Sequence, residues 1–256
     1  MITIKSLREI EIMARAGRIV AGVHALMREL VRPGITTEEL DAAAETFIRG
    51  HAGATPSFKG LYGFPKTLCV SIDQEIVHGI PSRKRVLAAG SIVSVDVGVQ
   101  LEGLHADSAT TLPVDVITPQ AQRLLDVTQE CLAAGVAQAR VGNHIGDIGH
   151  AVQTVAEGAG FGVVRELVGH GIGTRFHEEP QIPNYGSPKR GPRLLEGMTL
   201  AIEPMITLGA PATRTLSDKW TVVTADGSLS AHFEHTVAVT AGGPRILTTT
   251  DERMRG

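Results

Sequence analysis

The sequence predicts a protein of the α+β class, in which helices and antiparallel strands occupy separate stretches of the chain. Two helical stretches open the chain, a β-hairpin and two further helices follow, and strands dominate from residue 163 onward. The 256 residues are 43% hydrophobic, which supplies a substantial core without disulfide bonds. No linker, low-complexity stretch or block of like charge divides the chain, so we expect a single domain over residues 1–256.

The four predicted helices are marked by their ends. The first two begin at capping boxes, the pairs Ser6 with Glu9 and Thr36 with Glu39. Apolar residues at helical spacing continue the first helix to Pro33-Gly34, and Gly50 ends the second. Pro119 begins a third helix that reaches about residue 140, and a fourth is predicted over 144–157.

Strands are predicted from alternating β-branched residues and the turns that bound them. Residues 91–100 and 109–116 form a predicted hairpin, and 68–72 form a separate strand after the Gly- and Pro-rich loop 57–66. The later strands are expected at residues 163–168, 198–207, 221–224 and 231–240.

A short internal echo suggests that the chain has two related halves. Gly90 precedes Asp96 by six residues at the head of one strand, and Gly197 precedes Glu203 by six at the head of another. Two matched positions do not establish a repeat, so the echo gives a hypothesis of two α+β halves and no more.

Composition excludes several classes of protein. The 24 Lys+Arg and 27 Asp+Glu leave a formal net charge of −3, which disfavours nucleic acid or a membrane surface as the principal partner. Cys69 and Cys131 lie among apolar residues, as is typical of reduced core thiols in a cytosolic protein. The N-terminal residues lack the apolar run of a signal peptide, and no apolar stretch approaches a membrane span of about 18 residues. We expect a soluble cytoplasmic protein.

The first candidate site is the pair Asp96 and Asp107 in the predicted hairpin. If the turn centres on residues 101 and 102, Asp96 lies directly opposite Asp107, with Cβ atoms about 4.5–5.5 Å apart. Like charges at that distance destabilise the fold unless a cation lies between them, so the pair indicates a metal or a basic side chain. An aspartate that caps a turn or pairs with a base remains the alternative.

The second candidate is the glycine-bracketed segment GHGIGTRFHEEP, residues 169–180, which holds His170 and His177. The glycines let the backbone approach neighbouring groups closely. Both a ligand or catalytic role and a purely structural role remain open for these histidines.

The third candidate is the pair Glu203 and Glu234, each an isolated acid in an apolar, strand-like segment. Carboxylates are rarely buried without a partner, although an edge strand would explain either one alone. With the two aspartates and His170 they make a ligand set of four carboxylates and one imidazole, without a thiolate. Four negative charges match two divalent cations, and this set suits Mn, Fe or Co better than a structural zinc.

A competing interpretation is a mononuclear iron site of the oxygenase type. His105 and Asp107 with His232 or His235 would supply its two histidines and one carboxylate. It leaves the remaining acids and His170 unexplained.

Five segments together carry a resemblance to a known family: VHGIP (77–81), DVGVQLEGLHADSATT (96–111), GHGIGTRFHEEP (169–180), AIEP (201–204) and FEHT (233–236). In order and spacing the chain resembles the type I methionine aminopeptidases. The resemblance implies the pita-bread fold, with two pseudo-symmetric halves around a curved antiparallel sheet with flanking helices. It also implies removal of the N-terminal methionine from nascent proteins and peptides when the second residue is small, through attack of a hydroxide activated by two metal ions on the first peptide bond.

The resemblance implies a role for each ligand-type residue. Asp96 would bind one metal, and Asp107 and Glu234 would bridge both. His170 and Glu203 would complete the second metal site. The two divalent ions would be Co, Mn, Fe or Zn.

Three catalytic roles follow from the same resemblance. Glu203 would also act as general base toward the attacking water. His78 and His177 would hydrogen-bond the scissile amide and its developing tetrahedral intermediate.

The methionine side chain would lie in a pocket lined, by resemblance, by Phe58, Leu61, Phe64, Cys69, His78, Phe176, His177 and Trp220. Aromatic edges suit a flexible thioether. The chain departs from the family pattern in two places. The loop reads LYGFP where YHGYP is frequent, and Gly98 stands where a hydroxyl residue is common beside the metal-binding aspartate.

The expected partners are N-terminal methionyl peptides and nascent chains, with transient contact to the ribosome. No stable nucleic-acid or membrane partner is expected, and the protein is expected to be a monomer.

Overall fold

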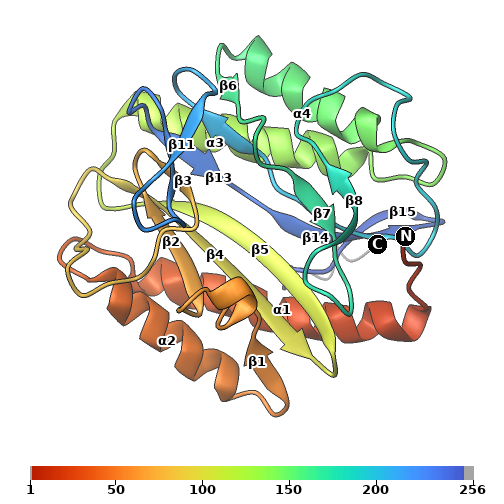
Figure 1. Ribbon diagram of the computed structural model, residues 1–256, viewed down its shortest axis with the longest axis horizontal. Helices are drawn as coiled ribbons and strands as arrows, with labels where there is room; N and C mark the ends of the chain where they lie inside the picture. The colour runs from red at the N-terminus through yellow and green to blue at the C-terminus, as the bar shows by residue number, and fades with distance from the viewer. Residues whose placement is uncertain (1, 251–256) are drawn as a thin grey trace.

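The computed structural model describes residues 2–250 and arranges them in two halves, each with a helix pair packed against strands (Figure 1). Residues 1 and 251–256 of the predicted domain lie outside the described residues. The predicted α+β class is confirmed, and so is the division into two related halves. Each half has its own apolar core beneath its helix pair.

The first half contains α1 (Leu7–Leu30), α2 (Thr37–Arg49), β1 (Ala54–Pro56), the 3₁₀ helix η1 (Leu61–Gly63), β2 (Leu68–Ile72), β3 (Glu75–Val77), β4 (Ile92–Leu101) and β5 (Leu104–Pro113). Its main sheet has the order β1-β4-β2, and β5 also pairs with β4. Both predicted capping boxes are present, with the Ser6 and Thr36 hydroxyls accepting from the backbone N–H of Glu9 and Glu39.

The second half begins with α3 (Pro119–Ala137) and α4 (Ile145–Gly158), close to their predicted bounds. Its strands are β6 (Gly162–Val163), β7 (Gly169–Gly171), β8 (Glu178–Ile182), β9 (Thr199–Ile202), β10 (Met205–Thr207), β11 (Thr213–Thr215), β12 (Val222–Thr224), β13 (Ser230–His232), β14 (His235–Thr240) and β15 (Gly243–Ile246). The largest sheet here has the order β15-β14-β9-β7-β8, and β13-β10-β6 and β11-β12-β3 form two smaller sheets.

The predicted hairpin is present, but its second strand begins at Leu104 rather than at residue 109, and its register differs from the predicted one. The turn lies at Glu102-Gly103, where φ is 49° and 79°, because a two-residue turn that follows strand twist needs positive φ at both positions. Asp96 therefore faces Ala109, and Asp107 faces Gly98. The shift is two residues, so both aspartates keep the same face of the sheet and lie as diagonal neighbours.

The long predicted strands of the second half are interrupted. Residues 198–207 split into β9 and β10 at Glu203-Pro204, and 231–240 split into β13 and β14 at residues 233–234. Proline lacks the N–H that a continuous ladder needs, which explains the first break. Of the predicted strand 163–168, only Val163 lies in a strand, β6. Glu203 and Glu234 thus lie between strands rather than within them.

Matching features support the internal echo. Gly90 and Gly197 both have left-handed backbone, with φ of 88° and 86°. In each half, the N-cap residue of the second helix forms an isolated β-bridge with the residue four positions before the glycine of that half. The two bridges are Thr36 with Val86 and His144 with Arg193.

Hydrogen bonds from the backbone and one side chain of β5 join the two halves at the segment between β13 and β14 and at the start of β14. The Glu234 N–H donates to the Ala109 carbonyl at 3.0 Å, and the Ser108 hydroxyl donates to the Glu234 carbonyl at 2.6 Å. The Thr236 hydroxyl both accepts from the Asp107 N–H and donates to the Asp107 carbonyl, at 2.9 and 2.8 Å. These bonds hold Asp107 beside Glu234.

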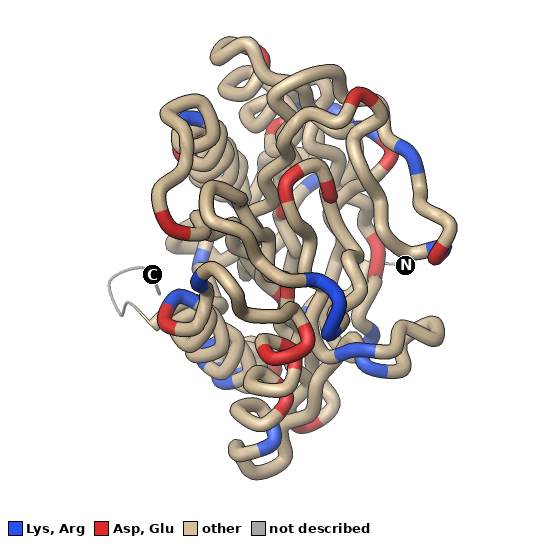
Figure 2. Tube along the Cα trace, turned by 90° about the vertical axis from the view of Figure 1, so that its left-hand side faces the viewer, with Lys and Arg blue, Asp and Glu red and all other residues tan. Residues whose placement is uncertain are grey.

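Basic and acidic residues are interspersed on the side of the molecule shown in Figure 2, without a single-sign field across it. Within residues 2–250, none of the helices has the length and apolar character that a bilayer crossing requires.

Candidate metal centre and adjoining pocket

One cavity of about 140 Å³ gathers the predicted site residues from both halves. One wall is polar and is formed by His78, Asp96, Asp107, His170, His177, Glu203 and Glu234. The other is mostly apolar and is formed by Phe58, Leu61, Tyr62, Phe64, Cys69, Phe176 and Trp220. Every predicted site residue is present, and Tyr62 is an addition that the sequence analysis did not include.

Asp96 on β4 and Asp107 on β5 bring two buried carboxyl groups into contact. Burial raises the pKa of both, and the Asp107 charge raises that of Asp96 further. The pKa of Asp107 reaches about 7. Two such groups without a cation resist ionisation together, as like charges in a low-dielectric site do.

Glu203 and Glu234 add two more carboxyl groups from the breaks between strands. Burial is the main cause that raises the pKa of each, and the charge of Asp107 adds to it in both. The Glu203 backbone is held by Asn184, whose Nδ2 donates to the Glu203 carbonyl at 2.9 Å. The Glu203 carboxylate lies 3.5 Å from Nε2 of His232. His232 is buried, and the sequence pattern did not group it with these four acids.

His170 on β7 presents one ring nitrogen to the acids. Its Nδ1 donates to the Gly171 carbonyl at 2.8 Å, which leaves Nε2 as the unprotonated nitrogen of the neutral ring. Nε2 lies 3.8 Å from Oε1 of Glu203. Burial lowers the pKa of His170 to about 3, so the ring is neutral at pH 7, as a metal ligand must be.

The donor set fits a divalent metal. Ligand atoms of Asp107, His170 and Glu234 lie within 4.8 Å of one another. Among the described residues, Asp96 Oδ1, Asp107 Oδ1 and Glu234 Oε1 are buried and lack a hydrogen-bond partner. Buried carboxylate oxygens left without a donor are costly, and a hard cation would satisfy all three.

His78 and His177 flank the acids on the side of the apolar wall. His78 follows β3 with φ of 59°, a left-handed conformation that is uncommon outside glycine and is often found at functional sites. Its ring packs edge-on to Trp220, with centroids 6.5 Å apart. Burial lowers the pKa of His78 to about 4 and also lowers that of His177, so both rings are neutral at pH 7.

Aromatic pairs build the apolar wall. Phe58 meets Phe176 edge-on at 5.3 Å, and Phe64 meets Trp220 edge-on at 5.1 Å. Cys69 is buried between them as a free thiol, and burial followed by the Asp96 charge raises its pKa well above the usual value. The thiol therefore stays neutral and serves as an apolar surface.

The departure at position 98 has a steric reason. A Cβ on Gly98 would lie 2.8 Å from Cε2 of Phe176, 2.8 Å from Cβ of Ser57 and 3.0 Å from Cε1 of Phe58. The two phenyl rings thus occupy the space that a side chain at position 98 would need.

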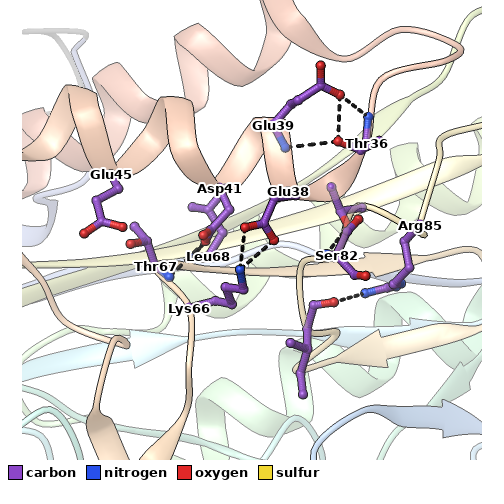
Figure 3. A network of polar contacts seen from close by, with 12 residues as sticks. Thr36, Glu38, Glu39, Asp41, Glu45, Lys66, Thr67, Leu68, Ser82 and Arg85 are labelled. Atoms are coloured by element: carbon purple, nitrogen blue, oxygen red, sulfur yellow. Dashed lines mark hydrogen bonds and ion pairs between the residues drawn. The ribbon is translucent and has the colours of Figure 1, made fainter.

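The loop that carries Phe58, Leu61 and Phe64 is fastened to α2 (Figure 3). The Asp41 carboxylate accepts from the backbone N–H groups of Thr67 and Leu68, at 2.9 and 2.8 Å. Lys66 donates to Glu38 at 2.7 Å beside them. These contacts set where the pocket loop enters β2.

The competing iron site is not assembled. Both ring nitrogens of His105 have hydrogen-bond partners, Ser57 Oγ at 2.9 Å and Gln100 Nε2 at 3.1 Å. His235 Nδ1 is bonded to Thr248 Oγ1 at 2.8 Å. His232 faces Glu203, with which the oxygenase interpretation did not group it.

A family model and two curated relatives agree on the family that this chain resembles. The model of metallopeptidase family M24 matches residues 11–241. A methionine aminopeptidase of Clostridium perfringens is 52% identical over 97% of this chain and 99% of its own length. Methionine aminopeptidase 1 of Mycobacterium tuberculosis is 49% identical over 95% of this chain and 94% of its own length.

Solved structures agree. Methionine aminopeptidase from Thermotoga maritima superimposes with a TM-score of 0.95 at 42% identity, over 97% of this chain and 100% of that chain. A prolidase from Pyrococcus horikoshii, at 21% identity and a TM-score of 0.77, shares the fold over 98% of this chain and 65% of that one.

Proposed function

Because this chain belongs to metallopeptidase family M24, within its methionine aminopeptidase branch, we propose that it removes the N-terminal methionine from nascent proteins and peptides whose second residue is small. It is a metal-dependent hydrolase of the pita-bread fold. One observation carries the substrate assignment. The acid and histidine cluster opens directly onto an apolar pocket in a cavity of only about 140 Å³, which suits one unbranched side chain at the end of a peptide.

The pocket chemistry supports methionine as that side chain. Phe58, Phe64, Phe176 and Trp220 offer ring edges, and the neutral Cys69 thiol adds a soft surface. A thioether gains on the order of 0.3–1.5 kcal/mol from each sulfur–aromatic contact. Leu61 completes the apolar wall of the pocket, at the position where the family pattern frequently has a tyrosine.

Asp96, Asp107, His170, Glu203 and Glu234 would hold two divalent ions, of the set Co, Mn, Fe and Zn. Such ions supply a lowered pKa for water and polarisation of the scissile carbonyl. Four carboxylates balance the charge of two divalent ions, and both halves contribute ligands. We therefore treat residues 1–256 as a single catalytic domain.

The protein's own groups would then move the protons and position the amide. Glu203 would accept a proton from the attacking water, and the buried position that raises its pKa suits this role. His78 and His177, neutral at pH 7, each have an N–H that would donate to the carbonyl oxygen as charge develops on it. The scissile amide would have to approach the ions and both histidines closely, which would leave room only for a small second residue.

The setting that this activity requires is the cytoplasm, where nascent chains emerge. We propose that the protein acts there as a monomer, with transient rather than stable contact to the ribosome. The balanced surface charge in Figure 2 is compatible with brief encounters and gives no reason to expect stable nucleic-acid or membrane binding.

The activity is tested with tripeptides and defined metals. Metal-free protein should regain turnover when Mn, Co or Fe is added, and Met-Ala-Ser should be cleaved far faster than Met-Ile-Ser or Leu-Ala-Ser. Calorimetric titration should show two metal ions per chain. Equal cleavage of Leu-Ala-Ser, or activity on an Xaa-Pro dipeptide alone, would replace the methionine assignment.

The catalytic roles are tested by substitution. His78→Ala should keep its metal content and lose about 10²–10⁴-fold in turnover, the range for a proton-transfer or positioning group. Glu203→Gln should lose at least as much and also bind one metal more weakly. Turnover near that of the unmodified protein in metal-loaded His78→Ala would remove His78 from the mechanism.

A further inference from the structure

Tyr62 lies against His177 at the mouth of the cavity. The two rings are stacked, with centroids 5.7 Å apart and planes 19° from parallel. The phenol oxygen lies 3.3 Å from Nδ1 of His177, within hydrogen-bonding distance. This contact joins η1 of the first half to the segment between β7 and β8 of the second.

The backbone holds Tyr62 in this position at some cost. Tyr62 has φ of 51° and ψ of 19°, a left-handed conformation that large side chains seldom adopt, and 73% of the residue is exposed. The loop around it is closed by the Gly60 N–H, which donates to the Phe64 carbonyl at 2.8 Å. Burial of apolar surface does not explain a strained and exposed aromatic residue, whereas its contact with His177 does.

The hydrogen bond engages one particular nitrogen of the His177 ring, Nδ1. A phenol that donates to Nδ1 leaves the single proton of the neutral imidazole on Nε2. The His177 ring also meets His170 and Phe176 edge-on, at centroid distances of 4.4 and 4.8 Å, and these two contacts restrict its tilt without choosing a tautomer. A hydrogen bond donated by Tyr62 would therefore fix the tautomer, which the contacts with His170 and Phe176 leave open.

We propose that Tyr62 is a positioning residue for His177, which holds the imidazole in the tautomer and orientation needed to donate Nε2–H to the scissile carbonyl. This inference rests on the proposed role of His177 and adds a residue to it. In this role Tyr62 acts through His177 and not on the reacting atoms.

The kinetic test uses Tyr62→Phe, which keeps the stacked ring and removes only the hydroxyl. With Mn-loaded protein and Met-Ala-Ser, kcat should fall about tenfold, the factor for one hydrogen bond of ordinary strength. KM should stay within twofold of its value in the unmodified protein, and the thermal unfolding midpoint should stay within about 1 °C. Both are expected if the variant loses only a contact that positions His177. Tyr185→Phe is the matched control, because Tyr185 is the only other tyrosine of the chain and packs on Arg165; it should leave kcat unchanged.

A double-mutant cycle separates positioning from a general structural effect. In a His177→Ala background, Tyr62→Phe should cause no further loss of kcat, because the group it orients is gone. An undiminished tenfold loss in that background would overturn the inference.

A spectroscopic readout is independent of turnover. With ¹⁵N-labelled histidine and diamagnetic zinc-loaded protein, the His177 signals, identified by their absence in His177→Ala, should show a single Nε2–H tautomer. In Tyr62→Phe the same signals should shift toward a mixture of tautomers. Unchanged signals in Tyr62→Phe, or full kcat in that variant while His177→Ala is impaired, would overturn the inference alone. Failure of the unmodified protein to release methionine would instead overturn the proposed function.

Discussion

At the scale of single residues, Gly98 and the phenyl rings of Phe58 and Phe176 depend on one another. The glycine follows Asp96 by two positions on β4, on the face that carries the site. Its missing side chain lets both rings reach over the strand and form one wall of the pocket. A residue close to an aspartate with a proposed metal-binding role therefore contributes to the shape of the pocket rather than to the proposed ligand set.

Gly98→Ala should destabilise the protein by about 1–3 kcal/mol, because the new methyl group would force the rings out of a packed arrangement. It should also raise KM for Met-Ala-Ser. Chemical unfolding and steady-state kinetics measure the two effects. Gly158→Ala is the control, since a Cβ there meets nothing within 4 Å, and it should be neutral or stabilise by up to about 1 kcal/mol. Equal stability of the two variants would show that the rings yield without cost.

At the scale of elements, α2 acts as the support of the pocket loop. Asp41 projects from this helix into the start of β2, where its carboxylate accepts two backbone N–H groups. The ion pairs of Glu38 with Lys66 and of Glu45 with Lys59 also tie the loop to the helix, nearer to solvent. Figure 3 shows Asp41 and Glu38 pointing toward the loop from the same helix.

Asp41→Ala should lower the free energy of unfolding by about 2–4 kcal/mol, because it leaves two buried N–H donors without an acceptor. Asp41→Asn keeps one acceptor oxygen and should lose less. Glu45→Ala, on the same helix, removes only exposed ion pairs and should cost under about 1 kcal/mol. Urea unfolding of the three variants checks this order, and a cost for Glu45→Ala equal to that of Asp41→Ala would contradict it.

At the scale of the whole molecule, the two halves meet at a cluster of buried carboxyl groups, whose negative charges a bound metal would neutralise. Four carboxyl groups from both halves have pKa values raised by burial, and the charge of Asp107 raises those of the other three further. A carboxyl group with a higher pKa in the folded state than in the unfolded state makes folding less favourable as pH rises through the interval between the two values. The buried histidines act in the opposite direction, but only below about pH 7, because above it they are neutral in both states.

Metal-free protein should therefore lose thermal stability as pH rises from 7 to 8.5. Manganese should raise the melting temperature, and the rise should be larger at pH 8 than at pH 7. Asp96→Asn removes one of the like charges, so its metal-free form should be more stable than the unmodified metal-free protein at pH 8 while gaining less from manganese. Differential scanning calorimetry decides the matter: absence of any metal-dependent rise would rule out the proposed metal centre.

Several features were predictable from the sequence because their causes are local. The capping boxes at Ser6 and Thr36 and the proline at position 119 mark helices that the structure contains. The alternation of the hairpin placed Asp96 and Asp107 on one face, and a register error of two residues did not alter that, because side chains alternate with a period of two. The resemblance to the aminopeptidases, carried by short segments in order, indicated the family.

Other features were decided only by tertiary structure. The hydrogen bonds between β5 and the Glu234 segment join strands from opposite halves, which no local pattern relates. The raised carboxyl pKa values exist only where burial and neighbouring charges combine. The contact between Tyr62 and His177 likewise joins residues 115 positions apart. Only the fold brings these groups within a few ångströms, because the short-range forces that link them act through space and not along the chain.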